Sequence, residues 1–508
     1  MLPSHFNLAE YVLARSASEH PEKAALLVYS EPAAAPEVTF TFAEIEDAVL
    51  RIATGLVERG VERGDRLLLR LGNTPEFPLV FFGAIAAGCV PVPTSAQLTS
   101  GECDKLLIDS GARLVVHDDH TPLPAERAGV GRLGSEGIAA LHKAARGSYA
   151  DTAADDPAFL VYTSGTSGKP KGVLHAQRSA FGRRPMYRGW YGIGPDDVLL
   201  HAGAFNWTYT LGVGLTDPWA NGATSIVYTG HRDPDVWPSL LESTGATLFA
   251  AVPSLYRRIL KYGHIGSHSF PSLRHGLTAG EALRPSMHAE WLEKTGRPLY
   301  EALGMSEIST YISSGPETPT RPGSPGRPQP GRNVAILSEE ADGTVLGPDE
   351  PGLLCVHRSD PGLMLGYWQD EAGTDEAFLG EWFRTGDRAR IDADGYVWYE
   401  GRADDVMNAF GYRVAPEEVE AALAGHPLVH DVAVTETEVR DGIRLITAFV
   451  VPNGDEHPNE GELNDWCHAR LAEYKRPRRW VFVHDLPRTP SGKVQRRELA
   501  KKVPPHSH

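Results

Sequence analysis

The stretch LVYTSGTSGKPKG, from Leu160 to Gly172, is more informative about the fold than any other part of the chain. A short apolar run, typical of a buried strand, ends near Tyr162 and leads into a loop of glycine, serine, threonine and lysine. Glycines let consecutive backbone N–H groups turn towards one anion, and hydroxyl groups add further donors. Lys169 and Lys171 supply positive charge. The sequence therefore predicts a strand followed by a loop that binds a polyphosphate.

Two other loop motifs do not match this stretch. A P-loop needs four residues between its first glycine and the Gly-Lys pair, whereas Gly165 lies only three positions before Gly168. The GxSxG turn of hydrolases has its second glycine where this chain has Lys169. A flexible Ser/Gly linker is the remaining alternative, and the embedded lysines and the preceding strand argue against it.

Length and charge indicate a large globular protein with at least two domains. The chain has 508 residues, more than one hydrophobic core usually supports. Asp and Glu (66) outnumber Lys and Arg (49), which gives a formal net charge of −17. This excess disfavours binding to nucleic acid or to an anionic membrane. Any anionic substrate must therefore be held by a local group of donors.

The cysteines and the first residues predict a soluble, cytoplasmic protein. The chain has four scattered cysteines, Cys89, Cys103, Cys355 and Cys467. They form no CxxC pair, so we expect neither a zinc site nor a disulfide framework. The N-terminal residues carry Glu10 and no continuous apolar core, which argues against a signal peptide. The most apolar stretch, residues 79–93, is too short to span a bilayer.

Hydrophobic periodicity predicts an α/β fold over roughly the first three hundred residues. Thr41 and Glu44 have capping-box spacing, and apolar residues then recur at helical intervals up to Leu56. A strand-like run at 67–71, a helical segment at 76–88 and a strand at 90–92 follow. We therefore expect a large N-terminal domain of layered α/β subdomains.

Residues 313–332 hold six prolines and four glycines. This composition is typical of an interdomain linker or of an ordered loop that leads into a small β subdomain. Strand-like runs follow at 334–337 and 353–357, and a better boundary lies after 401–405. We therefore favour the ordered loop.

The residues after 405 predict a small, mobile α+β domain. The pattern is a helix at 416–424, strands at 432–434 and 445–451, a helix at 463–474 and a strand at 480–483. About a hundred residues are enough for an independent domain. We place the N-terminal domain at 1–403 and the C-terminal domain at 404–508.

The 160–172 stretch resembles the signature loop of the adenylate-forming (AMP-binding) superfamily, which includes acyl- and aryl-CoA ligases, luciferases and peptide-synthetase adenylation domains. Further segments resemble other motifs of this family, in the order in which the family has them. They are AGEAL (279–283), EALGMSEIS (301–309), WFRTGD with GRADD (382–405), AFGYRVAPEEVE (409–420) and LPRTPSGKVQRREL (486–499). The resemblance covers nearly the whole chain and is nearest to benzoate–CoA ligase-like enzymes.

The resemblance implies an ATP site with Mg²⁺. The residues implied at the ATP phosphates are Thr163, Ser164, Gly165, Thr166, Ser167, Gly168, Lys169 and Lys171. Those implied at AMP are Gly280, Glu281, Ala282, Glu301, Ala302, Leu303, Gly304, Ser306, Asp387 and Arg402. Asp387 would accept hydrogen bonds from both ribose hydroxyls. Glu307 would hold Mg²⁺, because a hard cation prefers carboxylate and phosphate oxygens.

Two positions depart from the family pattern. Ser306 replaces a threonine and keeps the hydroxyl group, and Leu303 replaces the tyrosine that often covers the adenine. Aliphatic residues at the position of Leu303 also occur in benzoate-type ligases.

The C-terminal motifs imply a CoA site, a hinge and a catalytic lysine. Gly411, Tyr412 and Arg413 match the motif along which the pantetheine arm of CoA passes. Asp404 matches the hinge about which the C-terminal domain rotates, and Lys493 matches the catalytic lysine. CoA is therefore expected as a co-substrate.

The chemistry explains why a lysine and a rotation are needed. The carboxylate of the acid attacks the α-phosphorus of ATP, and like charges at about 4 Å repel by roughly 4 kcal/mol at an effective dielectric constant of about 20. Lys493 would offset this repulsion and stabilise the transition state, and Mg²⁺ on Glu307 would help pyrophosphate to leave. The lysine must then move away to admit the thiol, which a rotation about Asp404 achieves.

A second hypothesis concerns control of Lys493. Pro487, Gly492 and Lys493 have the PxxxxGK spacing that often marks lysine acetylation in bacterial relatives. A lysine acetyltransferase is therefore a predicted partner, because acetylation removes the charge.

The predicted acid pocket is mostly apolar. Its walls are Trp207, Tyr209, Ala279, Leu303, Met305 and Ile308. A second carboxylate would be unpaired there, so a monocarboxylic acid is favoured. Gly304 stands where acetyl-CoA synthetases have a blocking tryptophan, which favours an acid larger than propionate. We predict a benzoate-like acid, with medium-chain and alicyclic acids as alternatives.

Other functions stay open at this point. The nearest alternative is a stand-alone adenylation enzyme that loads a carrier protein, and another is a noncatalytic nucleotide-binding protein. A luciferase-type oxidation is compatible with the motifs, and a homodimer is a further expectation.

Overall fold

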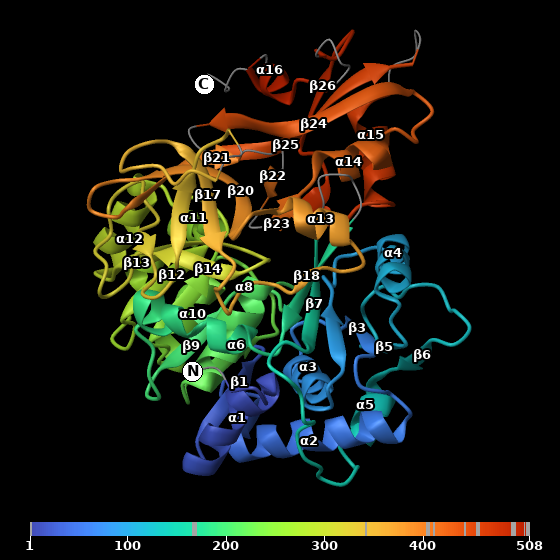
Figure 1. Ribbon diagram of the computed structural model, residues 1–508, viewed down its shortest axis with the longest axis vertical. Coiled ribbons are helices and arrows are strands. Elements are labelled where there is room, and N and C mark those ends of the chain that lie inside the picture. Colours follow the sequence, from blue (N-terminus) through green and yellow to red (C-terminus); the bar gives the residue numbers. More distant parts are fainter. Residues whose placement is uncertain are drawn as a thin grey trace.

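The computed structural model describes residues 3–164, 170–340, 343–402, 407–409, 412–440, 443–453, 458–488, 494–501 and 503. The chain has a mixed α/β fold, which confirms the predicted fold class. Residues from β24 (Val429–Arg440) onwards lie at one end of the long axis, and the larger N-terminal part fills the other end (Figure 1). Within the described ranges, no helix has both the length and the apolar character needed to cross a bilayer.

A nine-stranded sheet forms the centre of the N-terminal part, in the order β15-β14-β13-β12-β11-β9-β10-β1-β2. Its strands are β1 (Ala24–Tyr29), β2 (Val38–Thr41), β9 (Val198–His201), β10 (Thr224–Tyr228), β11 (Leu248–Ala251), β12 (His275–Ala279), β13 (Leu299–Met305), β14 (Ser309–Ser313) and β15 (Arg327–Pro328). Strands β1 and β9 to β13 run parallel, whereas β2, β14 and β15 are antiparallel to their neighbours. Parallel strands need crossover connections, so helical segments cover both faces.

Alternate residues of β9 pack into cores on opposite faces of this sheet. Leu200 joins a cluster with side chains of α10 (Val236–Thr244), α11 (Pro253–Tyr262) and α12 (Pro285–Thr295). Leu199 joins a different cluster with side chains of η1 (Tyr187–Tyr191) and α8 (Thr208–Leu211). This alternation is the period of two that a strand imposes on its side chains.

Short helical segments connect these elements. They are α6 (Ser179–Gly182), α7 (Arg184–Met186), η2 (Gly212–Thr216), α9 (Asp217–Ala220) and η3 (Ile265–Ser267). Arg183, between α6 and α7, forms buried contacts with α9 and with strand β14. Its guanidinium forms two hydrogen bonds with Asp217, of 2.8 and 2.7 Å, and Nη1 also donates to Ser309 Oγ.

A four-stranded parallel sheet in the order β4-β3-β5-β6 forms a second α/β layer. Its elements are β3 (Arg66–Arg70), β4 (Val90–Pro93), β5 (Leu114–His117) and β6 (Gly131–Leu133), with α1 (Leu8–Glu19), α2 (Phe42–Glu58), α3 (Glu76–Ala86), α4 (Ser100–Ser110) and α5 (Ser135–Leu141). The predicted capping box is confirmed, because the Glu44 N–H donates to Thr41 Oγ1 and the Thr41 N–H donates to Glu44 Oε2. Both bonds satisfy N–H groups that a helix start would leave unpaired.

The predicted phosphate loop follows a strand, as expected. β7 (Pro157–Ser164) pairs antiparallel with β8 (Pro170–Ala176), and Ser164 lies opposite Pro170 in the register. β18 (Gly366–Tyr367) extends this small sheet beside β8. The loop is therefore the connection of a hairpin, and its residues 165–169 lie outside the described ranges.

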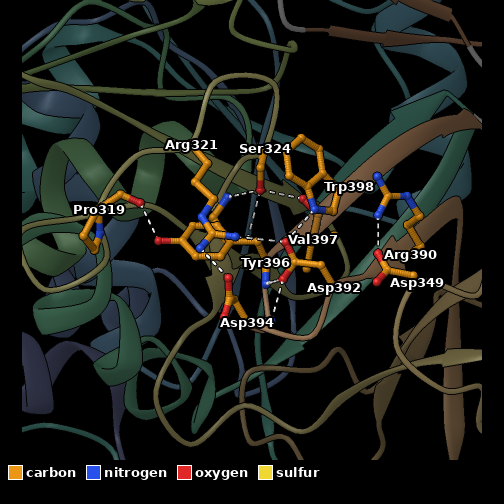
Figure 2. Close-up of polar contacts among 11 residues, drawn as sticks. Pro319, Arg321, Ser324, Asp349, Arg390, Asp392, Asp394, Tyr396, Val397 and Trp398 are labelled. Atoms are coloured by element: carbon orange, nitrogen blue, oxygen red, sulfur yellow. Dashed lines mark hydrogen bonds and ion pairs between the residues drawn. The ribbon is translucent and has the colours of Figure 1, made fainter.

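The proline-rich segment is an ordered loop that leads into a β subdomain, as predicted. The subdomain contains β16 (Val334–Leu337), β17 (Gly352–His357), β19 (Phe378–Leu379), β20 (Trp382–Ile391) and β21 (Val397–Arg402), with α13 (Glu371–Glu376). Figure 2 shows how the loop binds the β20–β21 hairpin: Arg321 forms ion pairs with Asp392 (3.1 Å) and Asp394 (2.6 Å). The Tyr396 ring lies 3.9 Å from the Arg321 guanidinium, and its hydroxyl donates to Pro319 O. These contacts hold the segment in one conformation, whereas its composition was compatible with either an interdomain linker or an ordered loop.

The C-terminal part is an α+β unit around the three-stranded sheet β24-β25-β26. Its elements are β22 (Met407–Ala409), β23 (Tyr412–Val414), α14 (Pro416–Leu423), β24 (Val429–Arg440), β25 (Ile443–Pro452), α15 (Glu460–His468), η4 (Glu473–Lys475), β26 (Arg479–Phe482) and α16 (Arg496–Lys501). The helix predicted at 463–474 was placed too late. Asn459 and Glu462 form a capping box that starts α15 at Glu460, and Leu471 lies beyond its end, buried in the core.

The cation–π contacts of Tyr396 suggest a test of the loop anchor. We expect Tyr396→Leu to lower the free energy of unfolding by about 2–4 kcal/mol, because it removes a buried ring together with its contacts to Arg321 and Arg327. Tyr396→Phe keeps the ring and loses only the bond to Pro319 O, at a cost of about 1 kcal/mol. Urea unfolding measures both. Equal losses would show that the ring contacts contribute nothing.

Candidate active site

The candidate site lies where the parallel strands of the nine-stranded sheet end. β9, β11 and β12 end at His201, Ala251 and Ala279, and the segments that follow β9 and β12 carry the predicted residues Trp207, Tyr209 and 280–282. In open parallel sheets, ligands bind outside the carboxyl ends of the strands. The topology therefore brings together residues that lie about a hundred positions apart in the sequence.

Three alanines and two aromatic side chains form what we call the acid slot. Ala250, Ala279 and Ala302 belong to one buried cluster on one face of β11, β12 and β13, and Tyr209 packs into the same cluster. Ala279 is directly opposite Ala302 in the register. Trp207 meets Tyr209 edge to face, with ring centroids 5.2 Å apart. These methyl groups and aromatic rings lie at the carboxyl edge of the sheet, where the acid pocket is predicted.

The other predicted pocket residues belong to a neighbouring cluster. Ile308 is buried there, and Leu303 and Met305 pack against it together with residues of the small β subdomain. Gly304 separates the two groups. A Cβ at this position would lie 2.5 Å from Ser309 O, so the close pairing of β13 with β14 requires glycine.

The turn after β12 is held by two glutamates of the predicted AMP site. Gly280 has a φ of 92°, which favours glycine. Glu281 Oε2 accepts from the Ser254 N–H (3.1 Å), and Glu301 Oε1 accepts from the Leu283 N–H (2.9 Å). Burial raises the pKa of Glu301 to about 8. Both carboxyl groups therefore shape the AGEAL turn, while contacts of Glu281, Ala282, Glu301 and Ser306 with a nucleotide remain predictions.

The structure brings Glu307 next to the phosphate-loop hairpin. Glu307 is 3% exposed, and the Tyr367 hydroxyl donates to its Oε1 at 3.0 Å. Lys171 Nζ lies 4.4 Å from the centre of the Tyr367 ring. Tyr367 thus links the predicted metal carboxylate to a predicted phosphate lysine. It stands in a two-residue strand, so nothing in its sequence surroundings signalled this position.

The donor set at Glu307 fits Mg²⁺. Among the residues that the structure describes, no group of three or more His, Cys, Asp or Glu could hold a metal ion. Mg²⁺ usually binds through one or two carboxylates, substrate phosphates and water. A single buried carboxylate beside a phosphate loop matches that pattern.

The predicted ribose carboxylate is buried beside Arg402. Asp387 is 4% exposed, its Oδ1 accepts from the Tyr399 hydroxyl (3.3 Å), and it is paired with Arg402 in the β20–β21 register. The side chain of Arg402 lies outside the described set, as do the side chains of Ser164 and Arg413. The predicted residues Gly165, Thr166, Ser167, Gly168, Lys169, Asp404, Gly411 and Lys493 also lie outside it.

Tyr412, a predicted CoA residue, connects the C-terminal part to the acid slot. Its ring stacks on Tyr474 with a centroid distance of 4.0 Å and on Trp207 with a distance of 5.8 Å. Because Trp207 also contacts Tyr209, an aromatic column runs from the C-terminal part to the slot. Spacing in the sequence could not indicate this column, since its members come from distant segments.

A buried ion pair holds the same two parts together. Lys475 Nζ lies 3.0 Å from Glu102 Oε1 and 2.6 Å from Glu418 Oε1. Burial opposes the charge of Lys475, but Tyr474, Glu418 and Glu102 outweigh it and raise the pKa. Glu102 also caps α4, because its Oε2 accepts from the Thr99 N–H. The sequence shows the Thr99–Glu102 capping box, but it does not show that the second oxygen binds a lysine 373 positions away.

A pocket lies between the two parts at this point. Thr163 and Pro170, at the two ends of the phosphate loop, line it together with Asn206, Tyr474 and Lys475. The phosphate-loop hairpin, the loop between β9 and α8 that carries Asn206, and the C-terminal part therefore line the same pocket.

Comparisons with known proteins identify the family of the chain. The model of the AMP-binding enzyme family matches residues 13–368, and that of the AMP-binding enzyme C-terminal domain matches residues 418–493. The 3-hydroxybenzoate–CoA ligase of Aromatoleum sp. (strain CIB) is 32% identical over 91% of this chain and 92% of its own length. The 4-hydroxybenzoate–CoA/benzoate–CoA ligase of Rhodopseudomonas palustris is 33% identical over 91% of this chain and 88% of its own.

A solved structure is similar over nearly the whole chain. It is a double mutant of o-succinylbenzoate CoA synthetase from Bacillus subtilis, bound to the product analogue OSB-NCoA. The TM-score is 0.83 at 27% identity, over 97% of this chain and 98% of that chain.

The buried ion pair can be tested by hydrogen exchange. We expect Glu102→Gln to speed amide exchange of residues 412–414 and 472–475 by about a hundredfold or more, because Lys475 then keeps a buried charge with one partner fewer. Glu473→Gln removes an exposed partner of Arg478 and serves as the control without effect. Unchanged protection in Glu102→Gln would show that the pair does not hold the two parts together.

The raised pKa of Glu436 predicts that the stability of the fold depends on pH. Burial, and to a smaller degree the charge of Glu281, raise the pKa of Glu436 to about 7, although the Asn408 N–H and Arg444 favour its charged form. The folded chain therefore holds this proton more tightly than the unfolded chain, so stability falls as the pH rises from about 4.5 to about 7. We expect Glu436→Gln to unfold at higher urea than the parent at pH 7.5 and to lose this advantage at pH 5. An advantage independent of pH would contradict the assignment.

Proposed function

Because the chain belongs to the AMP-binding enzyme family, we propose that it joins an aromatic, benzoate-like monocarboxylic acid to CoA. As an AMP-forming acid–CoA ligase it uses ATP, Mg²⁺ and CoA. The acid and ATP first give an acyl-adenylate and pyrophosphate. The acyl-adenylate and CoA then give acyl-CoA and AMP.

The acid slot is the observation that carries the aromatic assignment. Its floor of alanine methyl groups and its wall of Trp207 and Tyr209 suit a flat ring, since aromatic rings pack well in stacked or edge-to-face contacts. Met305 and Ile308 add apolar surface beyond Gly304. The names of the relatives, which include hydroxybenzoate and benzoate ligases, support the same substrate class.

The slot also supports a monocarboxylate. Its described residues, Ala250, Ala279, Ala302, Trp207 and Tyr209, carry no charge. A second carboxylate buried among them would lose its hydration without gaining a partner. An acid with one carboxylate can direct that group towards the phosphates and leave only its ring in the slot.

The adenylation step depends on charge neutralisation. The acid is already ionised at neutral pH, so it needs no general base. Glu307 would hold Mg²⁺, which lowers the negative charge on the phosphates and assists the departure of pyrophosphate when it is bound. Lys171 and the glycine-rich loop would hold the phosphates, and we assign the α-phosphate and the acid carboxylate to Lys493.

The arrangement of the C-terminal part supports a role in the second step. Tyr412 lies against Trp207 at the acid slot, where the thiol of CoA must arrive. Arg488 and Val494, on either side of Lys493, form an antiparallel bridge, and Arg488 binds Asp431 of β24. We infer that residues 404–508 rotate about Asp404, so that Lys493 serves adenylation and the Gly411–Arg413 turn serves thioester formation.

The acceptor of the acyl group follows from this arrangement. The similar o-succinylbenzoate CoA synthetase is bound to a CoA product analogue, which supports free CoA over a carrier protein. A comparison of free CoA with a phosphopantetheinylated carrier protein, at equal thiol concentration, separates the two. Acetylation of Lys493 and a homodimer remain hypotheses.

Separate assays of the two half-reactions test the proposal. We expect Lys493→Ala to lower acid-dependent ATP–pyrophosphate exchange by at least about a hundredfold, because the meeting of the two anions loses its counter-charge. Thiolysis of supplied aroyl-adenylate should stay within about tenfold of the parent. Lys501→Ala, which removes an exposed lysine paired with Glu498, is the matched control.

Two outcomes would contradict the proposal. Equal loss of both half-reactions in Lys493→Ala would remove the separation of roles. An acid panel of benzoates, alicyclic acids and medium-chain fatty acids, scored by CoA-dependent AMP release, tests the substrate class. A preference for octanoate over every benzoate would overturn the aromatic assignment.

A further inference from the structure

His201 ends β9 at the carboxyl edge of the nine-stranded sheet, on the face that forms the acid slot. Leu199, two residues earlier, packs into the same cluster as Tyr209 and Ala250, and side chains two residues apart in a strand share a face. His201 is directly opposite Ala250 in the β9–β11 register. Its side chain is 3% exposed. The imidazole is therefore a buried part of the slot.

The orientation of the His201 ring is fixed by Gly203. Nδ1 of the ring accepts a hydrogen bond from the Gly203 N–H at 2.8 Å. A Cβ on residue 203 would lie 2.5 Å from His201 Cε1, so this contact requires glycine. Because a nitrogen that accepts carries no proton, the proton of the neutral ring is on Nε2. Burial, together with the positive charge of Arg232, lowers the pKa of His201 to about 3, which keeps the ring neutral.

The Nε2–H group is a buried donor that meets no acceptor among the described residues. Nδ1 and Nε2 lie on opposite sides of the ring, so this donor points away from Gly203. The Tyr209 ring meets the imidazole edge to face at 5.4 Å, and the Tyr209 hydroxyl is also buried without a partner within the described ranges. Buried polar groups in folded proteins nearly always have partners. Two such groups at one slot therefore suggest that a ligand supplies the missing bonds.

We propose that His201 is a specificity-determining residue whose Nε2–H donates a hydrogen bond to a hydroxyl oxygen on the ring of the bound acid. The inference rests on the proposed function, because it needs an aromatic acid in the slot. The Tyr209 hydroxyl accepts the proton of that same ring hydroxyl. A neutral donor cannot neutralise the charge of a second carboxylate buried in the slot, so the substituent is uncharged. The substrate class is then a hydroxylated aromatic monocarboxylic acid.

Matched acids test this on the unmodified enzyme. We expect kcat/KM for one of the 2-, 3- or 4-hydroxybenzoate isomers to exceed that for benzoate by about 10- to 100-fold, because benzoate leaves both buried groups unpaired. The methoxy analogue of that isomer accepts from Nε2–H but donates nothing to Tyr209, so it should fall between the two. The amino analogue is a poor acceptor for Nε2–H but donates to Tyr209, so it should also fall between the two. Benzoate used as well as every hydroxybenzoate would overturn the proposal.

Substitution of His201 provides the second test. In His201→Phe we expect the ratio of kcat/KM for the hydroxy acid to that for benzoate to fall to within about threefold of one, because the donor is gone. His201→Gln restores an N–H donor and should recover part of the ratio. His120→Phe changes a histidine far along the chain, after β5, and should keep the parent ratio. Each ratio compares two acids on one protein, so a general loss of folded enzyme cancels.

The outcomes separate this inference from the proposed function. No pyrophosphate exchange with any acid would overturn the proposed function. Exchange with aromatic acids, but with the parent ratio preserved in both His201→Phe and His201→Gln, would overturn only the role of His201. The ratio should also stay constant between pH 6 and pH 8, because His201 is neutral throughout. A ratio that rises as the pH falls would indicate a charged histidine and contradict the proposal.

Discussion

The common carboxyl edge of strands β9 to β13 is the constraint on which the rest of the structure depends. Parallel strands deliver the loops that follow them to one side of the sheet, so His201, the AGEAL turn and the segment before Glu307 meet there. We propose that a flat ligand binds against the face beneath them, where Ala250, Ala279 and Ala302 present only small side chains. Larger side chains on these strands would fill the slot, and the sheet would then be an ordinary core.

The C-terminal part covers this edge through two kinds of contact that differ in how easily they separate. Tyr412 stacks between Tyr474 and Trp207 over apolar surface, and such contacts are non-directional. The bond between Lys475 and Glu102 is directional and buried, and loss of one partner from such a pair costs about 3–5 kcal/mol. Glu418 moves with Lys475 because both belong to the C-terminal part, so the lysine keeps one carboxylate when Glu102 is released. If the C-terminal part is to bind the N-terminal part and also separate from it, Lys475 needs a carboxylate such as Glu418 that stays beside it.

Local signals in the sequence predicted the elements, whereas contacts between distant segments could not be predicted. The capping box at Thr41 and Glu44 depends on a short spacing, and the structure confirms it. Tyr367, Lys475 and His201 gave no such signal, because each matters through a partner supplied by another segment. The helix predicted at 463–474 failed for a related reason: Leu471 fits a helical pattern, but the C-terminal core takes it up after α15 has ended. Periodicity identifies which residues are buried and leaves open which partner buries them.

The unpaired donor of His201 has a consequence for the stability of the chain. A buried group without a partner costs about 1–3 kcal/mol, and folded chains are stable by only about 5–15 kcal/mol. An apolar ring in place of the imidazole would remove that cost. The Gly203 N–H would then donate to water or to another acceptor. The chain instead keeps a histidine whose Nδ1 is held by the Gly203 N–H and whose Nε2–H we propose to face the slot. An interaction that the protein does not make for itself is available in full to a ligand, and this is how a site made almost entirely of apolar atoms can still distinguish between two acids that differ by one oxygen.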